Sequence, residues 1–245
     1  MNDIIDLKIY RVPKKQDEYS KPFKVKNSKI PPPRNHCLFV APTNVGKTNM
    51  IIYMLDSPNF YAKKKMDKHG NKSKWDIVFL WSSTYHTDPL WKSCKSIHEE
   101  NVFTTYDDNE FREIVDNLTQ YNSENKETSP EVLIILDDIL PLPQKSYVYD
   151  YITRARHNKV TLWFACQKLS FTTPVVRNNC SHFYLFDIKN KKEREFILDE
   201  ILSQKIDKET SNKIWEYACD GAKWNFLLFN MREDLEHAFQ KQHLK

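Results

Sequence analysis

The chain contains 245 residues, of which 40% are hydrophobic, 13% aromatic and 29% charged. This composition is that of a globular protein, so it excludes an intrinsically disordered chain, and the length suits one substantial core with extensions better than two full domains. The formal net charge of +4 permits contact with a polyanion but does not require it.

The first predicted segment is an N-terminal arm or linker, residues 1–35, because it is polar and ends in three consecutive prolines, Pro31 to Pro33. An apolar run at 37–41 follows and is predicted to be a buried strand. Apolar spacing from 47 to 55 then fits a helix. The core is therefore predicted to begin as strand, loop and helix.

Strands and helices are predicted to alternate along the rest of the chain. Strand-like runs occur at 76–81, 102–106, 132–136, 160–166 and 183–186, helical patterns at 109–121, 144–157, 190–203 and 208–219, and a last apolar run at 224–230. This alternation predicts an α/β fold with a mainly parallel central sheet flanked by helices on both faces. We therefore assign one domain, 36–235, and a C-terminal tail, 236–245.

The segment 63–74 carries six lysines against one aspartate and is predicted to be a solvated loop. Contact between this loop and DNA phosphates is the less favoured alternative. The five cysteines lack paired or metal-ligand spacing, which favours reduced, mostly buried thiols. No stretch approaches the roughly 20 apolar residues of a membrane span, and the first residues lack a signal-peptide pattern, so a soluble intracellular protein is expected.

Residues 41–48, APTNVGKT, fit the P-loop pattern if an alanine is accepted in place of the first glycine. In such a loop, backbone N–H groups and the following helix surround phosphate groups, Lys47 pairs with β- and γ-phosphate oxygens, and Thr48 ligates Mg²⁺. The chain has three glycines in all, so Gly46 at the required position is informative. The sequence therefore predicts binding of ATP and Mg²⁺ by the residues Ala41, Pro42, Thr43, Asn44, Val45, Gly46, Lys47 and Thr48.

Two aspartates, Asp137 and Asp138, directly follow the most continuous apolar run of the chain, 132–136. A charged pair at the end of a buried strand is costly unless a cation or a positioned water uses it. We therefore predict that Asp137 holds Mg²⁺, directly or through water, and that Asp138 orients and deprotonates the attacking water. The alternative is an ordinary transition from strand to loop, where aspartate is common, but the P-loop upstream favours the functional interpretation.

Gln167 follows the predicted strand 160–166, and ligands of open parallel sheets gather at the carboxyl ends of strands. This residue is predicted to sense the γ-phosphate or to position water. The alternative is a polar residue that simply leaves a strand.

Three arginines are candidates for an arginine finger, which would stabilise transition-state charge at a neighbouring subunit's site. Arg156 is preferred, and Arg154 and Arg177 are the alternatives. Arg156 and the adjacent His157 could instead interact with the carbonyl groups at the end of their helix.

The order of these segments resembles a family: the genome-packaging ATPases of large eukaryotic DNA viruses and virophages, of poxvirus type, within the FtsK and HerA superfamily. The similarity lies in 41–48, 82–91 (SSTYHTDPLW), 132–138 (VLIILDD), 154–168 (RARHNKVTLWFACQK) and 174–186 (PVVRNNCSHFYLF). Together these segments span residues 36 to about 187.

The resemblance implies a RecA-like (ASCE) P-loop NTPase fold, with an additional strand between the P-loop strand and the acidic strand. It also implies an ATPase that forms a ring-shaped homo-oligomer and threads double-stranded DNA into a viral capsid, with the capsid or a portal-like vertex as a partner. Such a protein is expected in the cytoplasmic viral factory and in the virion.

Other functions remain open at this point. A P-loop kinase for a small acceptor would also pair a P-loop with acidic groups, although no Arg-rich lid segment follows the last core strand. A module that binds nucleotide without turnover, and a helicase with the same ATP site, are further alternatives.

Overall fold

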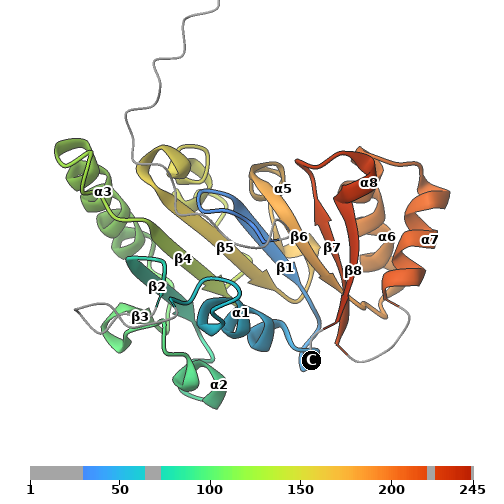
Figure 1. Cartoon of the computed structure of the whole chain (residues 1–245), viewed down its shortest axis with the longest axis horizontal. Coiled ribbons are helices and arrows are strands. Elements are labelled where there is room, and N and C mark those ends of the chain that lie inside the picture. Colours follow the sequence, from blue (N-terminus) through green and yellow to red (C-terminus); the bar gives the residue numbers. More distant parts are fainter. Residues whose placement is uncertain (1–29, 64–72, 220–223, 244–245) are drawn as a thin grey trace, which may run out of the picture.

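The computed structural model describes residues 30–63, 73–219 and 224–243 of the chain (Figure 1). In these residues an eight-stranded sheet has the strand order β3-β2-β4-β5-β1-β6-β7-β8. Strands β1 to β6 pair in parallel, whereas β7 and β8 run antiparallel to their neighbours. The strands are β1 (His36–Val40), β2 (Ile77–Ser82), β3 (Val102–Phe103), β4 (Val132–Asp137), β5 (Val160–Cys166), β6 (Cys180–Phe186), β7 (Asn225–Asn230) and β8 (Phe239–His243).

Helices cover both faces of the sheet (Figure 1). Successive residues of a strand point to opposite faces, so Leu38 and Val40 join the core cluster that contains residues of α3 to α8. Cys37 and Phe39 join a second cluster, to which α1 and α2 contribute. The predicted α/β architecture is confirmed. The helices are α1 (Lys47–Asp56), α2 (Pro89–Ser93), α3 (Asp108–Glu124), α4 (Tyr147–Tyr151), α5 (Pro174–Asn179), α6 (Lys191–Glu200), α7 (Lys208–Ala218) and α8 (Leu235–Ala238).

The strand order places the functional motifs at one edge of the sheet. β5 lies between the P-loop strand β1 and the acidic strand β4, so the additional strand implied by the resemblance is present. Because β1, β4 and β5 are parallel, their carboxyl ends share one edge, which we call the carboxyl edge. The opposite edge, where these strands begin, is the amino edge.

Several predicted elements are shorter than expected, among them the helix predicted at 190–203, which ends at Glu200 and is followed by a 3₁₀ turn, Leu202–Gln204. The strand predicted at 102–106 ends at Phe103, because Tyr106 turns away to hydrogen-bond Asp108 and Ser146. The helix predicted at 144–157 is divided into α4 and a 3₁₀ turn, Ala155–Asn158. At the break, Thr153 Oγ1 donates to the carbonyl oxygen of Asp150 at 2.8 Å, a local bond that competes with regular helix geometry.

The antiparallel end of the sheet differs from the sequence expectation. Two helices, α6 and α7, connect β6 to β7 and return the chain to the carboxyl edge, so β7 runs in the opposite direction. The expectation that 236–245 forms a tail was wrong for Phe239–His243, which forms β8. Phe239 stacks on Phe229 with ring centroids 4.6 Å apart, and this contact attaches the segment to β7.

Residues 30–35, the end of the expected arm, pack on the domain instead of leaving it. Ile30 and Asn35 are buried, and the backbone N–H of Arg34 donates to Thr161 Oγ1 at 2.7 Å. Residues 1–29, and residues 64–72 of the lysine-rich loop, lie outside the described residues. Within the described ranges no helix combines the length and apolar character needed to cross a bilayer. None of the five cysteines forms a disulfide, and all five are buried, as the sequence predicts.

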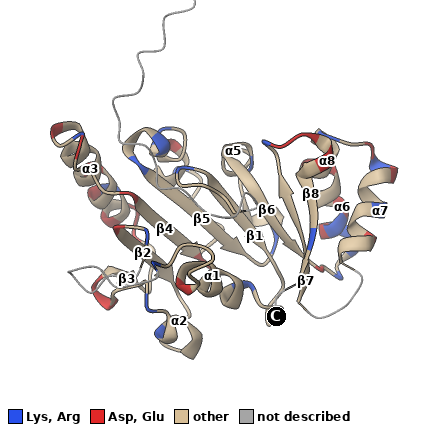
Figure 2. Ribbon diagram, viewed as in Figure 1, with Lys and Arg blue, Asp and Glu red and all other residues tan. Residues whose placement is uncertain are grey.

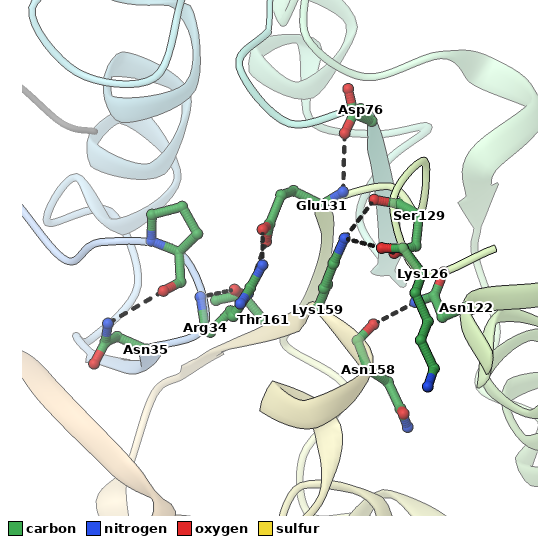
Figure 3. Close-up of polar contacts among 11 residues, drawn as sticks. Arg34, Asn35, Asp76, Asn122, Lys126, Ser129, Glu131, Asn158, Lys159 and Thr161 are labelled. Atoms are coloured by element: carbon green, nitrogen blue, oxygen red, sulfur yellow. Dashed lines mark hydrogen bonds and ion pairs between the residues drawn. The ribbon is translucent and has the colours of Figure 1, made fainter. Parts of the chain in front are cut away.

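A cluster of polar side chains holds the amino edge together (Figure 3). The Lys159 ammonium donates to the carbonyl oxygens of Lys126 and Ser129 at 3.2 and 3.1 Å. Beside it Arg34 forms an ion pair with Glu131. Burial raises the pKa of Glu131, while the positive charge of Arg34 opposes that shift. The cluster therefore connects the segment before β1 to the starts of β4 and β5.

Replacing Lys159 with methionine is expected to lower the free energy of unfolding by about 1–3 kcal/mol, because the carbonyl group of Ser129 loses the ammonium donor and that of Lys126 keeps only the hydroxyl of Ser129. Lys159 has a positive φ of 56°, and methionine meets the same backbone cost, so the change isolates the ammonium. The measurement is urea unfolding. Lys126→Met alters an exposed side chain of the same cluster. Its free energy of unfolding should stay within about 0.5 kcal/mol of the wild-type value. Equal unfolding midpoints for both variants would contradict this assignment.

Candidate active site

The P-loop connects β1 to α1 through two left-handed residues. Asn44 has φ 64° and Gly46 has φ 98°, and both residue types accept this conformation. Ala41 does not adopt a positive φ, and its N–H donates to the carbonyl oxygen of Cys166 at 3.0 Å. Alanine therefore replaces the first glycine of the pattern without backbone strain.

Helix α1 begins at Lys47 and has no acidic residue in its first turn. The unpaired N–H groups and the dipole of this helix end therefore keep the positive potential that attracts phosphate. Thr48 follows Lys47 and is partly exposed at the loop. The P-loop thus offers backbone donors, an ammonium and a hydroxyl on one short segment.

The P-loop lysine faces both aspartates at the end of β4. The ammonium of Lys47 donates a hydrogen bond to Asp138 Oδ1 and lies 3.6 Å from Asp137 Oδ1. Asp137 is only 1% exposed, and burial raises the pKa of its carboxyl group, whereas the charge of Lys47 opposes the shift. Asp138 is more exposed and has a positive φ of 51°. The backbone thus turns between the two carboxylates and gives them different surroundings.

The two oxygens of Asp137 have different partners. Oδ2 accepts hydrogen bonds from Ser82 Oγ at 3.1 Å and from Trp91 Nε1 at 3.0 Å. Oδ1 is buried and has no hydrogen-bond partner in the described part of the chain. A carboxylate oxygen of this kind fits Mg²⁺, which takes one or two protein carboxylates together with substrate phosphates and water. The described residues contain no group of three or more His, Cys, Asp or Glu arranged for a metal.

A pocket of about 550 Å³ opens beside these residues, a volume in the usual range for small-molecule sites. One wall is the P-loop with the start of α1, and another is the segment from Thr84 to Leu90, which leads into α2. Asp138 and Trp224 complete the lining. The pocket thus combines the Lys47 ammonium and the Thr48 hydroxyl with one aromatic side chain among its described lining residues.

Gln167 lies beside this pocket but does not line it. The residue is exposed and directly follows β5. On either side of it, Ala41 and Asp138 donate backbone N–H groups to carbonyl oxygens at the end of β5. The structure therefore places Gln167 between the two motifs, at the end of β5.

The three candidate arginines occupy different environments. Arg154 stacks over the rings of Tyr147 and Tyr151, at 5.3 and 5.8 Å. Arg177 is buried and forms an ion pair with Glu200 at 2.8 Å. Both are therefore held within their own chain.

Arg156 is exposed in the 3₁₀ turn before β5, and no ion pair to it is found among the described residues. Arg232 follows β7 at the same amino edge, since the backbone N–H of Met231 donates to Ser181 at the start of β6. Burial and the nearby charge of Arg156 lower the pKa of Arg232. The amino edge thus carries two neighbouring guanidinium groups, whereas the pocket lies at the carboxyl edge.

Sequence reasoning assigned no role to Ser82, Trp91, Trp224 or Arg232, nor to the pocket-lining residues Asn49, Thr84, Thr87, Asp88, Pro89 and Leu90. Ser82 and Trp91 lie in the segment 82–91, which the family resemblance includes without a role for either. A signal for Ser82 was its position at the carboxyl end of the strand before β4. No sequence pattern indicated Trp224, which reaches the pocket through the fold alone.

Comparison with known proteins gives one family and one recurring fold. The model of the family described as Poxvirus A32 protein matches residues 82–213, more than half of the chain. No curated protein matches the chain by sequence.

Several solved structures share the fold. B204, the DNA-packaging ATPase from Sulfolobus turreted icosahedral virus, matches with TM-score 0.60 and 12% identity, over 87% of this chain and 99% of that one. The packaging NTPase B204 from Sulfolobus turreted icosahedral virus 2, solved with AMPPCP, matches with TM-score 0.55 and 14% identity, over 86% and 98%. The type VII secretion ATPase EccC of Thermomonospora curvata matches with TM-score 0.52 and 10% identity, over 86% and 24%.

Proposed function

The chain belongs to the poxvirus A32 protein family, and we propose that it is an ATP-driven motor that hydrolyses Mg-ATP to move double-stranded viral DNA into a capsid. The observation that carries this proposal is the contact between Lys47 of the P-loop and the two aspartates after β4, in the wall of a nucleotide-sized pocket. The shared fold of a DNA-packaging ATPase supports the choice of DNA packaging.

The phosphate groups of ATP would lie against the P-loop and the start of α1. Thr48 and Asp137 would hold the metal ion, and Lys47 would exchange its hydrogen bond with Asp138 for the β- and γ-phosphate oxygens. Mg²⁺ bound there would neutralise charge on those oxygens. Lys47 would therefore contact the phosphates when nucleotide is bound and the carboxylate of Asp138 when the pocket is empty.

Asp138 is the residue that would accept a proton from the attacking water. It lines the pocket, whereas the carboxylate of Asp137 is buried and held by Ser82 and Trp91. Once Lys47 has moved to the phosphates, the Oδ1 atom of Asp138 is available to accept that proton. Gln167, beside the same edge, would sense the γ-phosphate or orient the water.

Arg156 would complete the site of a neighbouring subunit. It lies at the amino edge, while the pocket lies at the carboxyl edge of the same sheet, so the arginine does not serve its own site. A contact between opposite edges of two subunits is head-to-tail, and such contacts close into rings. We therefore propose a homo-oligomeric ring in which each pocket receives Arg156 from the next subunit.

The charge distribution bears on the path of DNA. Figure 2 shows acidic residues along α3, and Glu110, Glu113, Asp116 and Glu124 are exposed there. Such a face would repel phosphate, so the DNA would run along another surface. The capsid or a portal-like vertex would be the docking partner, in the infected cell or the virion.

Lys47→Ala is expected to lower phosphate release from ATP by about 10²–10³-fold, because a preorganised cation is lost from the phosphate site. Phosphate release is measured with and without duplex DNA, and DNA is expected to stimulate the wild type. Lys213→Ala, a change at an exposed lysine of α7, serves as the matched control and should hydrolyse ATP like the wild type. Equal rates for the two variants would refute the assignment of the ATP site.

Product analysis separates the motor from a P-loop kinase. The motor releases free phosphate, whereas a kinase leaves a phosphorylated acceptor and releases little phosphate without one. A strand-displacement assay on duplex DNA tests for helicase activity. Hydrolysis that duplex DNA does not stimulate would count against the DNA motor while leaving the ATPase in place.

A further inference from the structure

The orientation of the Asp137 carboxylate depends on two donors from other elements. The terminal torsion of an aspartate side chain is broad, so packing alone does not decide which oxygen faces the pocket. Here Ser82 Oγ and Trp91 Nε1 both donate to Oδ2, at 3.1 and 3.0 Å. Oδ1 is thereby left toward Lys47, 3.6 Å from its ammonium.

Trp91 is buried at 1% exposure, although it belongs to α2, a five-residue helix next to the pocket. Its indole N–H can only donate, so its bond to a carboxylate is unambiguous in direction. A hydrogen bond from a neutral donor to a buried carboxylate is stronger than one between two neutral groups. This tryptophan therefore contributes a directed contact as well as apolar volume.

The same two donors lie at the two ends of one wall of the pocket, the segment 84–90. Trp91 follows Asp88, Pro89 and Leu90, which line the pocket. At the other end of this wall, Ser82 Oγ lies 3.1 Å from Thr84 Oγ1, and Thr84 also lines the pocket. The wall segment 84–90 is therefore attached to Asp137 at both of its ends.

We propose that Trp91 is a positioning residue of the metal site, which together with Ser82 holds Asp137 so that Oδ1 faces the metal and the nucleotide phosphates. This inference rests on the proposed function, since it takes Mg-nucleotide as the ligand. It adds that the wall segment 84–90 is coupled to metal binding through the indole N–H. Orienting partners of metal ligands commonly contribute 10–100-fold to metal affinity or activity.

The test is the affinity for Mn²⁺, a paramagnetic substitute for Mg²⁺, measured by electron paramagnetic resonance in the presence of a non-hydrolysable ATP analogue. Trp91→Phe removes the donor and keeps an aromatic ring, and it is expected to weaken Mn²⁺ binding by about 10–100-fold. The Mg²⁺ concentration for half-maximal phosphate release should rise in the same proportion. Nucleotide binding without metal should change little.

Trp163→Phe is the matched control. Trp163 is fully buried in the same core cluster as Trp91, and its indole N–H has no hydrogen-bond partner in the described part of the chain. This variant loses the same volume, so it should lower the unfolding temperature without changing the metal affinity. Ser82→Ala, which removes the other donor to Oδ2, is expected to weaken Mn²⁺ binding several-fold and tests the same carboxylate if Trp91→Phe does not fold.

The outcomes separate this inference from the proposed function. Weaker Mn²⁺ binding in Trp91→Phe, or in Ser82→Ala, together with normal binding in Trp163→Phe supports the positioning role. Wild-type affinity in both Trp91→Phe and Ser82→Ala overturns it and leaves the ATPase proposal intact. If the wild type itself binds neither analogue nor Mn²⁺, the proposed function fails and this inference fails with it.

Discussion

Replacing Asp138 with asparagine is expected to lower the rate of ATP hydrolysis by about 10²–10⁴-fold, the usual contribution of a positioned general base. The amide cannot accept the proton of the attacking water. Asparagine nevertheless has nearly the same shape and tolerates the left-handed backbone that this position requires, with φ 51°. The expected variant is therefore folded and binds nucleotide, but it hydrolyses ATP slowly. The measurements are single-turnover phosphate release and equilibrium binding of a fluorescent ATP analogue.

A matched control for this change is Asp187→Asn. Asp187 directly follows β6 and is paired with Lys189, so it is also an aspartate at the carboxyl end of a parallel strand. It does not line the nucleotide pocket, and its substitution should leave hydrolysis near the wild-type rate. If Asp138→Asn also hydrolysed ATP at the wild-type rate, another group would have to be the base.

Replacing Arg156 with alanine is expected to lower DNA-stimulated hydrolysis by about 10³–10⁵-fold, the range measured for arginine fingers. The reason is the loss of the cation that, in the proposed ring, the next subunit would supply in the transition state. Nucleotide affinity should change little, because Arg156 lies at the amino edge, away from its own pocket. The rate constant is measured with the assembled oligomer, at saturating ATP and duplex DNA.

Mixing two inactive variants tests whether Arg156 acts between subunits. In an equal mixture of Arg156→Ala and Lys47→Ala subunits, roughly a quarter of the head-to-tail interfaces pair an intact pocket with an intact arginine. Activity is therefore expected to return on mixing. Arg154→Ala, which alters an arginine held by Tyr147 and Tyr151, is the comparison within the same turn. If Arg154→Ala lost most of the ATP hydrolysis while Arg156→Ala kept it, Arg154 would be the arginine finger.

The elements with continuous apolar runs could be predicted closely from the sequence. β5 has the bounds of the predicted strand, 160–166, and β4 ends at the first of the two aspartates, because buried parallel strands are apolar on both faces. The start of α1 followed from the P-loop pattern. The local sequence was sufficient in these cases, because the apolar character of each strand agrees with its burial in the sheet.

Features that depend on distant pairing could not be predicted. The donors to Asp137 come from positions 55 and 46 residues away, and only the strand order brings them together. β8 was missed because its sequence, FQKQH, is polar, and its stability comes from pairing with β7. The pocket contact of Trp224 is likewise a product of topology.

The hydrogen bond between Lys47 and Asp138 has a consequence for the end of the catalytic cycle. If hydrolysis products occupied the pocket, the carboxylate of Asp138 would compete with them for the ammonium of Lys47. The reason is that Lys47 can hydrogen-bond to Asp138 once the products leave. In the proposed ATPase, this competition would weaken the affinity for nucleotide and shorten the time that ADP and phosphate stay bound. Since product release limits the turnover of many enzymes, the ion pair would favour fast turnover over tight nucleotide binding.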